Sequence, residues 1–194
     1  MGGVVGGIFG RMVPHGELNP CIELLEEGMN ALRKTPFHDV LGRDFLHQTS
    51  TVAKYMIDFH RTSIEKINVA ALYFEMNGFT INPDRWYFDG FAYKTAEDVW
   101  ELEWLAHWDA DTDSDSFTLT GMESVQEAFA LYYCDESQPL SVKMAAELAD
   151  HLVTARFMQL IAAAHALTKQ TDNMLDGLPV LATAHDWDVV HQTR

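Results

Sequence analysis

The chain has 194 residues, of which 47% are hydrophobic and 11% aromatic, and it carries a formal net charge of −16. This composition excludes an intrinsically disordered protein, and the length suits one domain whose core folds without disulfide bonds. Between Thr95 and Val142 there are twelve Asp and Glu residues and no Lys or Arg. Negative charge concentrated in this way argues against binding nucleic-acid phosphates and favours a positively charged partner.

The N-terminal residues are rich in glycine and apolar side chains, and their one positive charge, Arg11, follows the apolar run. A secretory signal has the opposite order, and no stretch of the chain is apolar for the length that a membrane span needs. Cys21 and Cys134 fall in no paired spacing, which is typical of a reducing compartment. We therefore expect a flexible arm over residues 1–16, one domain over 17–194 and a cytoplasmic location.

The first half of the domain carries helix signals. Asn followed by Pro at residues 19–20 is a helix start, and apolar residues then recur at helical spacing. Thr-Pro at 35–36 repeats that signal for a short helix that ends near residues 45–47. Residues 50–77 combine one broad apolar face with a ladder of alternating charges, which predicts a long helix closed by Asn-Gly.

After this helix the hydrophobic period changes. A turn signal at residues 82–84 precedes an aromatic strand over 86–93. The further elements that we expect are a helix over 95–108, a short strand over 117–119, a helix from a capping box at 120–123 to residue 132 or 133, a second long helix over 140–169 and a strand over 178–184. The sequence therefore predicts an α+β fold, in which five or six helices, two of them long, pack against a small antiparallel sheet.

The predicted helix over 95–108 has tryptophans at positions i, i+4 and i+8, which would stack along one face: Trp100, Trp104 and Trp108. Glu97 and Glu101 flank this row. Tryptophan is enriched among interface anchors, so an aromatic patch with an acidic rim suits a basic partner or self-association. The alternative is that the row packs inside the protein's own core.

The loop after this helix has an aspartate at every second position: Asp109, Asp111, Asp113 and Asp115. This spacing occurs in calcium-binding loops, but an EF-hand also needs Gly at its sixth position and Glu at its twelfth. Ser114 and Thr120 stand there instead. We therefore interpret the loop as a solvated acidic turn and assign no metal or cofactor site to it.

Two His-Asp dipeptides could supply metal ligands, one at residues 38–39 and one at 185–186. We interpret both histidines as structural, since short His-Asp motifs are common. A di-iron bundle needs Glu-x-x-His spacings, and the chain has none. The chain also has no Gly-x-Ser-x-Gly elbow and no glycine-rich phosphate loop, so nucleophilic catalysis and nucleotide binding have no support.

These observations lead to a functional hypothesis. We predict a non-catalytic interaction module whose acidic surface binds a basic protein, as an inhibitor or an immunity-type protein does, with no nucleic-acid or membrane partner. The alternative is a metal-dependent hydrolase that uses the His and Asp pairs. The partner-binding residues that we predict are Glu97, Trp100, Glu101, Trp104, Trp108, Asp109, Asp111, Asp113 and Asp115.

Overall fold

The computed structural model describes residues 2–77, 82, 84–98, 100–112, 115–135, 137–171 and 174–193. In these ranges the chain forms five α-helices and a six-stranded sheet, so the predicted α+β class is confirmed. The α-helices are α1 (Gly2–Met12), α2 (Leu18–Asn30), α3 (Thr49–Ile64), α4 (Glu123–Tyr133) and α5 (Leu140–Thr171). None of the helices in the described ranges combines the length and apolar character needed to cross a membrane.

Short 3-10 helices connect several of these elements. They are η1 (Val13–His15), η2 (Pro36–Val40), η3 (Leu46–Gln48) and η4 (Leu102–Ala106). The strands are β1 (Ala71–Asn77), β2 (Tyr87–Tyr93), β3 (Ala110–Asp111), β4 (Phe117–Thr118), β5 (Val180–Ala184) and β6 (His191–Thr193). The short helix expected after residue 35 is therefore replaced by two 3-10 helices, of which η2 begins with a capping box between Thr35 and His38.

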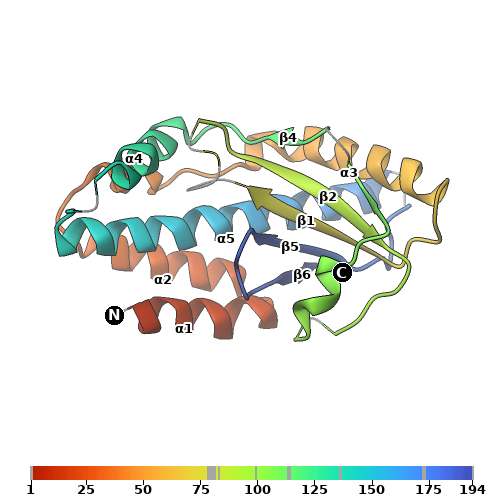
Figure 1. Ribbon diagram of the computed structural model, residues 1–194, viewed down its shortest axis with the longest axis horizontal. Helices are drawn as coiled ribbons and strands as arrows, with labels where there is room; N and C mark the ends of the chain where they lie inside the picture. The colour runs from red at the N-terminus through yellow and green to blue at the C-terminus, as the bar shows by residue number, and fades with distance from the viewer. Residues whose placement is uncertain are drawn as a thin grey trace.

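The sheet has the strand order β3-β2-β1-β5-β6, and β4 pairs with β2 beyond the end of β3 (Figure 1). β1 and β5 are parallel, whereas the other neighbouring strands are antiparallel. The sheet is thus mixed, and the expectation of a purely antiparallel sheet was wrong. Helix α5 precedes β5 and brings it beside β1, and parallel strands require a long crossover connection of this kind.

Helix α5 is the centre of the molecule. Figure 1 shows it running along the long axis, with α2 beside its first half and the sheet in front of its second half. Its stretch from Phe157 to Ile161 is almost fully buried, as its apolar sequence predicts. The two faces of β1 differ in what covers them. Leu72, Phe74 and Met76 face the helices, while Ala71 and Tyr73 belong to a smaller cluster on the other face.

Three further predicted elements differ from the structure. Residues 2–12, which we expected to be a flexible arm, form α1, and Phe9 on this helix is fully buried. The long helix predicted over 50–77 ends at Ile64, and its last seven residues are strand β1. The helix predicted over 95–108 is reduced to the five residues of η4. In both of the wrong helices, packing against the sheet determined the local conformation instead of helix propensity.

Candidate functional site

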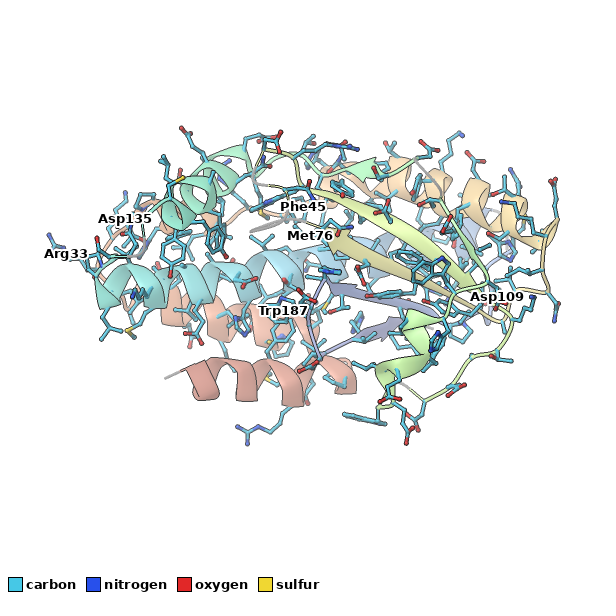
Figure 2. The ribbon with its side chains drawn as sticks, in the orientation of Figure 1. Arg33, Phe45, Met76, Asp109, Asp135 and Trp187 are labelled. Atoms are coloured by element: carbon cyan, nitrogen blue, oxygen red, sulfur yellow. The ribbon has the colours of Figure 1, made fainter. Side chains whose placement is uncertain are left out.

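The segment from Lys94 to Thr118 carries the predicted site. It leaves the end of β2, crosses the face of the sheet that the long helices do not cover, and returns as β3. There Ala110 and Asp111 pair with Ala92 and Phe91 of β2. Lys94 follows β2, and β3 pairs with the end of that strand, so the described residues around Lys94 and Asp109 lie at one end of the molecule, where Figure 2 labels Asp109.

Trp104 anchors this segment to the sheet. Its side chain is only 8% exposed and lies against Tyr93, with the two ring centroids 4.8 Å apart. Its indole N–H donates to the carbonyl oxygen of Asp98 at 3.3 Å, and the Tyr93 hydroxyl donates to the carbonyl oxygen of Leu105 at 2.8 Å. Trp104 therefore belongs to the core and not to the partner-binding row in which the sequence placed it, because η4 inserts it into the second face of the sheet.

The other two tryptophans of the row lie on the surface. Trp100 is 61% exposed and Trp108 is 48% exposed. The Trp108 indole N–H donates to Asp111 Oδ2 at 2.9 Å, and its ring centroid lies 5.0 Å from that of Phe91. Trp108 is thus held in a defined orientation with much of its indole ring still open to solvent. Since no continuous helix forms here, the three indoles do not make the single stacked face that the spacing predicted.

The carboxylates around these indoles are mostly solvated. Glu97, Glu101 and Asp109 are exposed. Asp109 Oδ2 accepts the backbone N–H of Lys94 at 2.8 Å, and its Oδ1 lies 2.9 Å from the Lys94 ammonium. These hydrogen bonds lower the pKa of Asp109 below its usual value. Asp109 therefore keeps its negative charge at neutral and mildly acidic pH. Asp113, the remaining aspartate at the centre of the predicted loop, lies outside the described residues.

The described aspartates of the acidic loop have separate partners. Asp111 is partly buried and binds the Trp108 indole, whereas Asp115 is exposed and its backbone carbonyl accepts the Tyr55 hydroxyl at 2.8 Å. Within the described ranges, no group of three or more His, Cys, Asp and Glu side chains is arranged to hold a metal ion. Asp111 and Asp115 instead border a cavity of about 420 Å³ against α3. The same cavity is lined by Tyr55, Asp58, Phe59, Thr62, Glu65, Lys66 and Thr112.

The sequence did not predict a polar network that lies on the face of the sheet not covered by the long helices. Glu75 accepts the Tyr73 hydroxyl at 2.6 Å and lies 2.8 Å from His185 Nδ1. Asp89 stands directly opposite Glu75 on β2 and accepts the Asn77 amide at 3.1 Å. Burial and the Glu75 charge raise the pKa of Asp89, and the hydrogen bond to Glu75 raises that of His185. A strand assignment for residues 71–77 would have revealed this network, since alternate residues then share one face.

The two His-Asp pairs do not converge on a common centre. His185 contacts Glu75 and, at 3.5 Å, the exposed Asp186. His38 Nδ1 accepts the backbone N–H of Thr35 at 3.0 Å, and the adjacent Asp39 is exposed. Each histidine thus has a local partner on Nδ1, while His38 Nε2 is buried and has no hydrogen-bond partner among the described residues. These contacts provide no support for the alternative of a metal-dependent hydrolase.

Comparison of this chain with protein-family models, with curated proteins and with solved structures found no match. The function must therefore be inferred from the surface itself.

Proposed function

We propose that the protein binds a basic protein partner through the surface formed by Glu97, Trp100, Glu101, Trp108 and Asp109, which we call the acidic-aromatic surface. The observation that carries this proposal is the exposure of two indoles, 61% for Trp100 and 48% for Trp108, in a stretch of chain that has carboxylates and no Lys or Arg from 95 to 142. Large exposed aromatic side chains are costly in water and are typical anchors of interfaces.

The two components of this surface have different roles in binding. The carboxylates attract a positively charged surface from a distance and accelerate association, an effect that salt screens. The indoles then lose their contact with water at the interface and slow dissociation. An inhibitor or immunity-type protein that covers the cationic active site of an enzyme is the concrete form of this function. The carboxylates would occupy the places of the phosphates that such an enzyme binds.

The first test is capture of the partner from the native host at low salt, followed by its identification and by calorimetric titration of the purified pair. We expect a basic partner whose affinity falls steeply as the salt concentration rises. The double variant Trp100→Ala/Trp108→Ala should weaken binding at least about 100-fold, because two interface anchors are removed. A captured protein without a basic surface, or an affinity that is indifferent to salt, would contradict the proposal.

A matched control removes exposed apolar side chains elsewhere. Leu24 on α2 and Leu140 at the start of α5 are 45% and 70% exposed, so Leu24→Ala/Leu140→Ala removes a comparable exposed apolar area and should leave affinity unchanged. Self-association through the same indoles is distinguished by light scattering. A dimer that the Trp100→Ala/Trp108→Ala variant converts to a monomer would replace the basic partner with a second copy of this chain.

A further inference from the structure

A second cavity lies between α4 and the first half of α5. Its volume is about 350 Å³. Figure 2 shows Asp135, just after α4, at the end of the molecule opposite Asp109, so this cavity is separate from the acidic-aromatic surface. The residues that line it are Phe129, Tyr132, Tyr133, Lys143, Ala146, Glu147 and Asp150.

Three aromatic rings form one side of this cavity. The Tyr132 and Tyr133 ring centroids are 5.3 Å apart with an interplanar angle of 70°, and Phe129 stacks on Tyr133 at 6.1 Å. Rings set at a large angle to each other present a face and an edge to the same space. The electron-rich face of an aromatic ring attracts a cation, and a guanidinium group can also stack on it.

The other side of the cavity holds a carboxyl group that lacks a hydrogen-bond partner. Asp150 Oδ1 is buried and has no donor among the described residues. Glu147 lies about one helical turn away on the same side of α5. Burial and the nearby Glu147 charge raise the pKa of Asp150 to about 7. A buried acceptor without a donor is destabilising, so a ligand that supplies the donor is favoured.

Asp150 and the aromatic side are close to each other. Besides burial, the negative charge of Asp150 contributes to raising the pKa of Tyr133 to about 12. The carboxylate of Asp150 and the phenol of Tyr133 also line the same cavity. Lys143 also lines the cavity, and this residue is exposed to solvent.

We propose that this cavity binds a small organic cation through its guanidinium group. Asp150 accepts the N–H donors of the guanidinium, Glu147 adds negative charge, and the rings of Tyr132 and Tyr133 contact its planar face. A guanidinium fits better than a quaternary ammonium, because only a group with N–H donors satisfies Asp150 Oδ1. The proposal does not depend on the acidic-aromatic surface or on its partner.

The test is calorimetric titration of the full chain with agmatine at pH 8, where Asp150 is ionised. We expect saturable binding of agmatine and at least about tenfold weaker binding of tetramethylammonium, which carries no N–H donor. N-acetyl-arginine amide distinguishes a free small molecule from an arginine side chain of a protein. If it binds as tightly as agmatine, the natural source includes arginine residues. The proposal is overturned if neither guanidinium compound binds.

Two variants locate the site. Asp150→Asn keeps the size of the side chain and removes its charge, and it should weaken agmatine binding at least about tenfold. The control Asp176→Asn removes an exposed carboxylate beyond the other end of α5 and should leave binding unchanged. Tyr133→Leu is the second variant and should weaken binding severalfold by removing one ring. Agmatine binding that is equal in the native chain and in Asp150→Asn would overturn the assignment.

Discussion

The acidic-aromatic surface and the α4–α5 cavity both place carboxylates beside aromatic rings, but in opposite environments. Asp109 is exposed and forms hydrogen bonds with Lys94, which lower its pKa, whereas Asp150 is partly buried with its Oδ1 shielded from water, and this burial raises its pKa to about 7. Asp109 therefore keeps its negative charge at physiological pH. The charge in the cavity depends on pH and acts only on a group in contact with it.

The largest effect should come from removing the residue that holds the acidic-aromatic surface in place. Trp104 is 8% exposed and packs on Tyr93, so Trp104→Ala should lower the free energy of unfolding by about 3–5 kcal/mol. Trp100 is 61% exposed, and Trp100→Ala should change it by less than about 1 kcal/mol. Urea denaturation measures both. Equal effects of the two substitutions would mean that the segment is not anchored by its middle indole.

The next largest effect should be the pH dependence of the free energy of unfolding that Asp150 in the cavity causes. The pKa of Asp150 rises on folding from 3.8 to about 7, so between these values the folded protein holds a proton that the unfolded chain has lost. Its contribution to stability therefore falls as the pH rises from 4 to 7. Asp150→Asn removes this loss, and the variant should be more stable than the native protein at pH 8 by up to about 4 kcal/mol.

At pH 4 the two proteins should be nearly equal in stability, because Asp150 is then mostly protonated in the folded native protein. The charged and titratable groups that face Asp150 in the cavity are Glu147 and Lys143 on α5 and Tyr132 and Tyr133 on α4. They are identical in both proteins, so the difference between the two pH profiles isolates Asp150. Urea denaturation at several pH values measures it. An Asp150→Asn variant that is less stable at pH 8 would show that the carboxylate has a stabilising partner.

The smallest effect tests the surface carboxylate. Lys94→Met removes the ammonium group next to Asp109 but keeps the backbone N–H that Asp109 also accepts. The pKa of Asp109 should rise part of the way to its usual value, as measured by NMR titration of the side-chain carboxyl carbon. Asp135 is the control, since its pKa is lowered by Ser137 and should not move. A Lys94→Met variant in which the pKa of Asp109 is unchanged would leave the backbone bond as its whole cause.

In the elements that were predicted correctly, the pattern of apolar residues in the sequence agrees with their burial in the structure. Residues 157–167 are mostly apolar, and most of them are buried or partly buried in α5. The prediction for residues 71–77 was wrong because their apolar residues fit both the helical and the strand period. Leu72, Phe74 and Met76 alternate as in a strand, yet the same stretch also continues the apolar face of the preceding helix. Pairing with β5, which is distant in the sequence, decides between the two, and local pattern cannot report it.

The same limit applies to the partner-binding residues, which stay a prediction. The structure leaves Glu97, Trp100, Glu101, Trp108 and Asp109 exposed. The burial of Trp104 could not be derived from helical spacing, because the segment does not form the predicted helix. The Trp104 indole instead packs on the face of the sheet that the long helices do not cover. The α4–α5 cavity could not be predicted from the sequence, because Tyr132, Tyr133 and Asp150 come together only when the two helices pack.

The parallel pairing of β1 with β5 also has a consequence for the growing polypeptide. β1 and β2 can form a hairpin early, but the second edge of β1 has no partner until the residues after α5 have left the ribosome. Until then, Leu72, Phe74 and Met76 lie on an open strand edge that can pair with another nascent chain. We therefore expect chaperone binding to be concentrated on intermediates that end before residue 178, and premature stop codons in this region to yield insoluble fragments.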